Sequence, residues 1–362
     1  MPPFDSIGGN APPQNMEKIV IAIDAMGGDN GPAVVIDGMA KSATKNPNIA
    51  FVLHGPQAEL EPLVVKKKAL KGLVSYADAS GVVTMDDKPT KVIRRKDTSM
   101  YSAVDSVRTG TAHSAVSCGN TGALMALSTL RLRKLPGVDR TAISILWPSL
   151  SPQGFNVMLD VGADVQADAK NLLQYALMGA SYARYGHALE RPRVGLLNIG
   201  TEEHKGRPEL QEAHGLITEF ADKAGFEFVG FVEGKDIPQN KADVIVTDGF
   251  TGNVAIKTGE GTASVIASEL KKTFQHSILS RLSALLAYTP LRRFKKRFDP
   301  RRANGGIFLG LNGTVVKSHG GADATGVSAA IKLAFTLAAS DFSENVASQI
   351  AASAELTMNA EK

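Results

Sequence analysis

The sequence predicts an α/β protein with a mainly parallel sheet covered by helices on both faces, a three-layer α/β/α arrangement. Two observations support this prediction. Short apolar runs alternate with helical stretches along most of the 362 residues, and at least five of the apolar runs end in small residues with a lone Asp, Asn, Lys or His. Parallel strands need crossover connections, which helices usually supply. Because ligands bind at the carboxyl ends of such strands, we expect these polar side chains to converge on one site.

The composition is that of a globular protein with a large core. The chain has 43% hydrophobic residues and 35 glycines. No apolar run approaches the roughly 20 residues needed to cross a bilayer, and the start lacks the pattern of a signal peptide. The single cysteine rules out an internal disulfide and a cysteine-rich metal site, and it favours a cytoplasmic location. We expect a flexible extension over residues 1–16, one catalytic domain over 17–353 and a tail over 354–362.

The first strand is predicted over residues 19–23, and a glycine-rich turn with Gly27 and Gly28 follows it. Pro32 then begins a helix. Backbone amides in such a turn can approach an anion closely, because glycine has no side chain. The dinucleotide fingerprint and the phosphate-loop motif are both absent from the sequence. A tight connection without a ligand is the alternative interpretation.

The remaining elements continue the alternation of strand and helix. Helices are predicted after each glycine-rich strand end, with a long amphipathic one over about 167–184 and an alanine-rich one ending near 350. Basic triplets at 66–68 and 94–96 are typical of solvated faces, and the second is also suited to steer an acidic partner. The further strands are predicted at 49–53, 74–77, 115–117, 141–147, 156–161, 194–197, 226–232, 244–247 and 314–317.

Two strand ends carry the most reactive-looking side chains. At the first, Asn120 or Thr121 caps a helix whose free amides favour an anion. Cys118 lies beside that helix start, but no base is adjacent in sequence, and a small buried residue is the favoured interpretation. At the second, residues 198–205 hold an amide, two carboxylates, an imidazole and an ammonium. A solvated loop with a helix cap is the alternative for that stretch.

Several motifs in the same order closely resemble the phosphate acyltransferases of bacterial phospholipid synthesis, the PlsX family. They are IDAMGGD at 23–29, GNTGAL at 119–124, LDVGA at 159–163, the stretch 195–206 and DGFTGN at 248–253. The resemblance implies a homodimer with a fold like phosphotransacetylase and isopropylmalate dehydrogenase. It also implies that inorganic phosphate attacks a fatty acyl thioester on acyl carrier protein. Residues 1–16 and the Gly321-Ala322 pair after His319 depart from the family pattern.

Phosphate is itself a nucleophile, so this chemistry calls for no metal and no cofactor, but for charge neutralisation and donors to the oxyanion. We predict Lys205, Asn253 and Asn120 as catalytic residues, with Lys205 on the phosphate or transition-state charge and the two asparagines as donors. Glu202 and Asp248 are expected to orient these groups, and His204 is expected to take no part. The predicted substrate-binding residues are Asp24, Gly27, Gly28, Gly119, Thr121, Asp160, Asn198, Glu202, Asp248, Gly252 and His319.

The basic character of the chain is local. Residues 271–302 hold ten Lys or Arg against one Asp, a net charge of +9, so the overall charge of +4 leaves −5 for the remainder. Apolar residues recur there at helical spacing, which predicts a protruding amphipathic segment that binds an anionic membrane surface reversibly. A core or dimer helix pair is the alternative, and the acidic carrier protein is a second possible user of these charges. The predicted membrane contacts are Phe274, Ile278, Leu282, Leu285, Leu286, Arg292, Arg293, Phe294 and Lys295.

The sequence therefore predicts an enzyme that makes acyl phosphate for phosphatidic acid synthesis, peripherally associated with the inner face of the cytoplasmic membrane. The expected partners are acyl carrier protein, inorganic phosphate, a second copy of the chain, the membrane surface and the downstream glycerol-3-phosphate acyltransferase. Nucleic acid is not expected, since no aromatic residues are interleaved for stacking. The alternatives are a transferase that uses acyl-coenzyme A, a dehydrogenase on the same fold, and a membrane-binding scaffold without catalysis.

Overall fold

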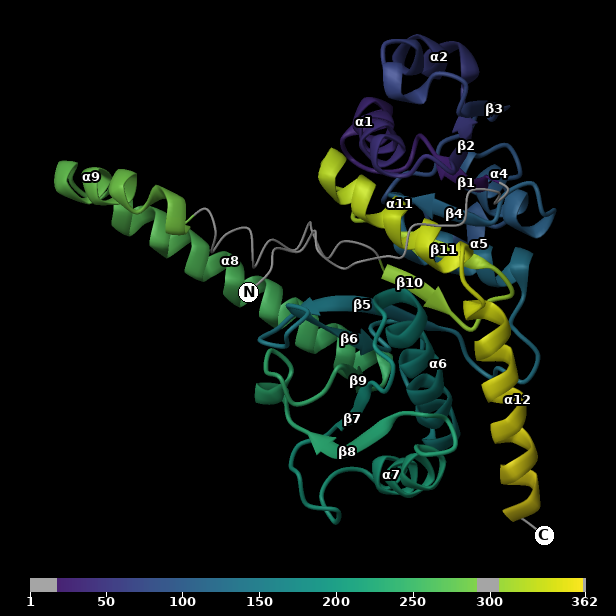
Figure 1. Cartoon of the computed structure of the whole chain (residues 1–362), viewed down its shortest axis with the longest axis vertical. Coiled ribbons are helices and arrows are strands. Elements are labelled where there is room, and N and C mark those ends of the chain that lie inside the picture. Colours follow the sequence, from purple (N-terminus) through teal and green to yellow (C-terminus); the bar gives the residue numbers. More distant parts are fainter. Residues whose placement is uncertain (1–17, 292–305, 361–362) are drawn as a thin grey trace.

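The computed structural model describes residues 18–291 and 306–360 (Figure 1). Its first half supplies β1 (Ile19–Asp24), α1 (Gly31–Lys45), β2 (Ile49–Gly55), α2 (Gln57–Val65), β3 (Val74–Asp78), α3 (Pro89–Val92), α4 (Ser99–Arg108), β4 (Ser114–Ser117), α5 (Thr121–Leu132), β5 (Ala142–Pro148) and β6 (Phe155–Leu159). The second half supplies α6 (Ala169–His187), β7 (Arg193–Leu197), α7 (Pro208–Phe220), β8 (Glu227–Val232), β9 (Val244–Val246), α8 (Gly249–Gln275), α9 (Ile278–Leu286), β10 (Gly306–Leu309), β11 (Thr314–Lys317), α11 (Ala324–Ala338) and α12 (Phe342–Ala360).

All of these strands form one sheet in the order β3-β2-β1-β4-β11-β10-β5-β6-β9-β7-β8. The sheet is mainly parallel, as predicted, but its two halves run in opposite directions. The strands β3, β2, β1, β4 and β11 are parallel to one another and form the first half-sheet. The strands β6, β9, β7 and β8 are likewise parallel and form the second half-sheet.

The reversal occurs in the middle of the sheet. There β10 is antiparallel to both β11 and β5, and β5 is antiparallel to β6. Three successive antiparallel pairings invert the strand direction. The carboxyl ends of the first half-sheet, which we call the first edge, therefore lie opposite those of the second half-sheet, the second edge.

Helices cover both faces of this sheet, because successive side chains of each strand point to opposite sides. Ile21 and Ile23 belong to a core shared with α1, α6, α7 and α11. Ala22, between them, belongs to a second core with residues of α4, α5 and α8. Two apolar cores separated by one sheet give the predicted three layers.

Two predicted elements differ from the observed ones, and one observed strand was not predicted. The alanine-rich helix is two helices, since α11 ends at Ala338 and α12 begins at Phe342. The helix predicted as amphipathic, α6, is buried on nearly every side up to Ala183, because α7, α11 and α12 pack around it. The short strand β10 was not predicted, and it is one of the strands at which the sheet reverses.

The helices α8 and α9 project away from the body of the protein (Figure 1). In α8 only Gly249, Gly252 and Ile256, all near its start, are buried, and α9 has no buried residue. No helix within residues 18–291 and 306–360 is long and apolar enough to cross a membrane. Five apolar residues of α9 are exposed: Ile278, Leu279, Leu282, Leu285 and Leu286. Phe274, near the end of α8, is half-buried. Four other predicted membrane contacts lie outside the described residues: Arg292, Arg293, Phe294 and Lys295.

Candidate functional site

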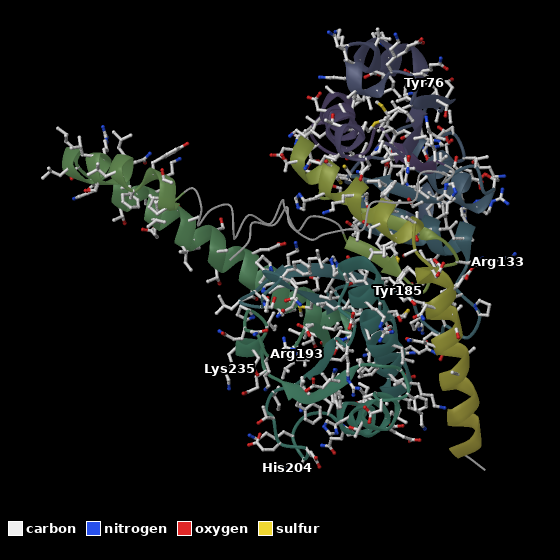
Figure 2. The ribbon with its side chains drawn as sticks, viewed as in Figure 1. Tyr76, Arg133, Tyr185, Arg193, His204 and Lys235 are labelled. Atoms are coloured by element: carbon white, nitrogen blue, oxygen red, sulfur yellow. The ribbon has the colours of Figure 1, made fainter. Side chains whose placement is uncertain are left out.

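The predicted site residues form two clusters rather than one. The loops after β1, β4 and β11 meet at the first edge, and the loops after β6, β9 and β7 meet at the second edge. The expectation that all of these strand ends converge is therefore wrong, because the central antiparallel strands point the two half-sheets in opposite directions. The two clusters also lie on different parts of the sheet: Figure 2 shows His204, in the loop after β7, at the end of the protein remote from Tyr76 of β3, as the strand order requires.

Asp24 ties the first-edge loops together. Its carboxylate accepts hydrogen bonds from the hydroxyls of Ser99 and Ser117, both at 2.6 Å, and from the backbone of Met26 at 3.3 Å. The residue is 1% exposed, and burial raises the pKa of its carboxyl, although these donors oppose the shift. Asp24 thus holds β1, β4 and the start of α4 in place, with its oxygens turned inward.

The glycines of the first edge allow the loops to touch. Gly28 has a φ of +101°, and a Cβ atom there would lie 2.8 Å from the Cβ of Cys118. A Cβ on Gly27 would lie 2.7 Å from the backbone nitrogen of Gly119. The loop after β11 closes on the same turn, where Asp29 N donates to the Gly320 carbonyl at 2.9 Å. Close backbone packing, rather than an open cradle, is what these glycines provide in the structure.

Asn120 is the helix cap at this edge, one of the two predicted. Its Oδ1 accepts from the backbone of Ala123 at 3.0 Å, and its Nδ2 donates to the carbonyls of Met85 at 2.8 Å and Asp87 at 3.2 Å. The amide is therefore engaged with the backbone, so a donor role toward substrate requires these bonds to exchange. Thr121 beside it is exposed.

Cys118 and Lys317 lie beneath these loops. Burial raises the pKa of the Cys118 thiol, which confirms the interpretation of a small buried residue. Lys317 is 9% exposed; its ammonium donates to the carbonyl of Cys118 at 3.2 Å and to that of Ser318. Burial lowers the pKa of Lys317 to about 8. His319, by contrast, is exposed, and its Nδ1 accepts from the backbone of Gly321 at 3.1 Å.

At the second edge, Asp160 organises the loop between β6 and α6. Its buried carboxylate accepts from the backbone nitrogens of Ile143 at 2.8 Å and Asp164 at 2.6 Å, among others. Burial raises the pKa of this carboxyl, and the backbone donors oppose the shift. Gly252 packs directly on the Asp160 backbone, which fixes the start of α8 against this loop. Asp160 and Gly252 thus have supporting positions.

The loop between β7 and α7 carries the exposed charges of the second edge. Asn198 anchors this loop, since its Nδ2 donates to the Lys205 carbonyl at 2.9 Å. The Lys205 ammonium lies 2.8 Å from the Glu202 carboxylate, and both side chains are exposed. The hydrogen bond from Lys205 lowers the pKa of Glu202. An ammonium in this position is accessible to a dissolved anion.

The start of α8 completes the second edge. Asp248 is its helix cap, accepting from the backbone of Thr251 at 2.8 Å, and it also pairs with Arg207. Asn253, in the next turn, is exposed and donates to the Val161 carbonyl at 3.1 Å. The second edge therefore brings two predicted catalytic residues, Lys205 and Asn253, into one group of loops, whereas Asn120 lies at the other edge.

Comparison with known proteins identifies the family. Residues 19–345 match the family described as fatty acid synthesis protein. The chain belongs to this family. A phosphate acyltransferase of Ruegeria sp. strain TM1040 is 68% identical over 97% of this chain and 94% of its own length. One from Ruegeria pomeroyi is 66% identical over 94% of this chain and 92% of its own length. The predicted family is thereby confirmed.

The fold prediction is confirmed as well. A phosphotransacetylase from Streptococcus pyogenes superposes on this chain with a TM-score of 0.59, covering 89% of this chain and 94% of that one. The sequence identity is 17%, so this likeness concerns the fold alone.

Two charged residues of the site loops were not singled out from the sequence. Arg207 follows Lys205 and Gly206 directly, and proximity to that predicted lysine was the available signal. Lys317 ends β11 just before the Ser318-His319 motif, and it was treated only as the last residue of a strand. Within the described ranges, no group of three or more His, Cys, Asp or Glu residues is placed to hold a metal ion.

Proposed function

We propose that this chain transfers a fatty acyl group from the thioester of acyl carrier protein to inorganic phosphate, giving acyl phosphate for phosphatidic acid synthesis. The observation that carries the proposal is the 68% identity, over nearly the whole chain, to a relative named phosphate acyltransferase. The exposed Lys205 and Asn253 at the second edge support it, because a cation and an amide donor suit the charges of such a reaction.

In the proposed reaction a phosphate oxygen attacks the thioester carbonyl carbon. The carbonyl oxygen becomes an oxyanion, the carbon–sulfur bond breaks, and the carrier leaves as a thiolate that takes up a proton. Lys205 neutralises the phosphate, and the Asn253 amide donates to the oxyanion. Glu202 positions Lys205 through their ion pair, and Asp248 fixes the start of α8, which carries Asn253, by capping that helix. Contacts of substrate with Thr121 and His319 at the first edge, and a direct role for Asn120, stay predictions.

The test is phosphate-dependent loss of thioester, measured with acyl carrier protein and with acyl-coenzyme A as alternative donors. We expect acyl carrier protein to give the higher kcat/KM and acyl phosphate to form in equal amount to the thioester lost. Preference for acyl-coenzyme A would instead identify a phosphotransacetylase-like enzyme. Absence of phosphate-dependent turnover with either donor would reject the proposal and leave the non-catalytic scaffold.

We also propose that α9 binds an anionic membrane surface, where the hydrophobic product is delivered to a downstream glycerol-3-phosphate acyltransferase. In α9 the exposed fractions of Leu282, Leu285 and Leu286 are 58%, 73% and 83%. Apolar residues left exposed on one short helix are typical of a helix that lies in a membrane interface. They are also typical of a contact between copies of a chain, and because a homodimer is expected here, the test must separate the two.

Replacing Leu282 and Leu286 by aspartate is expected to weaken binding to vesicles containing anionic lipid by about tenfold or more, because apolar burial is lost and repulsion is added. Vesicle co-sedimentation measures this. Val65→Asp, at a 76% exposed position of α2, is the control and should bind normally. Unchanged binding of the α9 variant, or a change in oligomeric state without a change in vesicle binding, would contradict the proposal.

A further inference from the structure

Arg207 occupies a junction between the two loops of the second edge that carry Lys205 and Asn253. It is the residue just before α7, and its guanidinium pairs with the Asp248 carboxylate at the start of α8. The two partners differ in exposure, because the Asp248 side chain is 2% exposed and the Arg207 side chain is 53% exposed. The Arg207 side chain is thus attached to the protein through its guanidinium while about half of its surface meets solvent.

The attachment is rigid because Asp248 is fixed independently of Arg207. Its Oδ1 accepts from the backbone of Thr251 at 2.8 Å, and its Oδ2 accepts from the Thr251 hydroxyl at 2.9 Å. The hydrogen bond from Arg207 to Asp248 runs from Nη2 to Oδ2. A side chain held in this way loses little conformational entropy when it binds a second acceptor.

The backbone between Arg207 and Lys205 is also fixed. Gly206 has a φ of +90°, which suits glycine, and its Cα packs against the Asn198 side chain. Asn198 in turn donates to the Lys205 carbonyl at 2.9 Å and is 7% exposed. The two cations of this loop therefore flank a single backbone turn that Asn198 holds in place.

We infer that Arg207 is a second phosphate-binding residue, which acts as a fork on two phosphate oxygens while Lys205 supplies a point charge. This inference rests on the proposed function and adds a residue to it. A guanidinium matches the oxygen pair of phosphate in a bidentate manner that an ammonium cannot reproduce. Asp248 would then act as a positioning residue for Arg207 in addition to capping α8.

The alternative is that the Arg207–Asp248 pair only stabilises the start of α8. Steady-state kinetics of Arg207→Met and Arg207→Lys separate the two roles. We expect Arg207→Met to raise the KM for phosphate by about tenfold or more and to leave the KM for the acyl thioester unchanged. Arg207→Lys should fall between Arg207→Met and the unmodified protein, because it keeps the charge and loses the fork. A lower melting temperature with an unchanged KM for phosphate would overturn the inference.

Arg191→Met is the matched control. Arg191 also pairs with an aspartate, Asp222, at 2.6 Å, and both side chains are exposed. It lies in the 188–192 loop before β7, which is at the opposite end of that strand from the second edge. Its replacement removes the same charge and one ion pair, and we expect no change in either KM. An equal rise in the KM for phosphate in Arg191→Met would show a general charge effect and overturn the assignment to Arg207.

Binding of inorganic phosphate without any thioester makes the result independent of turnover. We expect phosphate to raise the melting temperature of the unmodified protein and to have a much smaller effect on Arg207→Met. If no thioester donor reacts, the proposed function fails, yet Arg207-dependent phosphate binding still supports this inference. If phosphate does not bind, or binds Arg207→Met equally well, the inference is wrong even where acyl transfer is observed.

Discussion

Lys205→Ala is expected to lower kcat/KM for phosphate-dependent acyl transfer by about 100-fold, the usual loss when one charge-stabilising group is removed from a transition state. The physical reason is the position of the ammonium. It is exposed, it lies 2.8 Å from Glu202, and its backbone carbonyl is fixed by Asn198. Removing it leaves the loop anchored, so the effect should appear in turnover and not in folding.

The control for this variant is Lys223→Ala. Lys223 forms an exposed pair with Glu219 at 3.9 Å, but between α7 and β8, at the end of α7 remote from Lys205. We expect it to keep normal turnover in solution. Circular dichroism should show both variants folded. A near-normal rate for Lys205→Ala in a folded protein would exclude it from the reaction.

The stability of the protein is expected to rise with pH above about 8 because of Lys317. Burial lowers the pKa of its ammonium from the ordinary 10.5 to about 8. Between these two values the unfolded chain binds a proton that the folded chain has released, so the free energy of unfolding increases with pH in that window. The gain over the whole window is roughly 3 kcal/mol, as expected for a shift of this size.

Denaturant unfolding of the intact protein and of Lys317→Met at several pH values measures this gain. The difference in unfolding free energy between the two should grow from about pH 8 upward. Lys134→Met is the control, since the Lys134 ammonium also donates to a backbone carbonyl, that of Asp139, but from an exposed position. If the unfolding free energies of Lys317→Met and of the intact protein change with pH in the same way, Lys317 is not the origin of the gain in stability.

The fold class was predictable because it depends on local patterns. Each of these patterns spans only a few residues: apolar runs of strand length, glycine-rich strand ends and helix caps such as Asn120. Strand direction is not local in this way. One signal of strand direction was available, because β5 ends at Pro148 and β6 already begins at Phe155. A crossover between parallel strands needs a dozen or more residues, so such a short connection indicates an antiparallel pair.

The site was less predictable for the same reason. The sequence predicted Lys205 as catalytic and Asp24 as substrate-binding, yet the Asp24 oxygens accept hydrogen bonds from Ser99 and Ser117 whereas Lys205 is exposed. Which polar groups are consumed by the protein depends on contacts between residues far apart in sequence. The pairing of Arg207 with Asp248, 41 residues apart, is of this kind.

The order of strands in the sheet bears on how the chain comes together during synthesis. Among the strands of residues 18–291 and 306–360, β10 and β11 are the last to leave the ribosome. They nevertheless lie in the middle of the sheet, where β11 pairs with β4 and β10 with β5. Until residues 306–317 have emerged, β4 and β5 each present an open edge. Such edges pair readily with other chains, so a chain shortened before β10 should aggregate rather than persist as two separate folded halves.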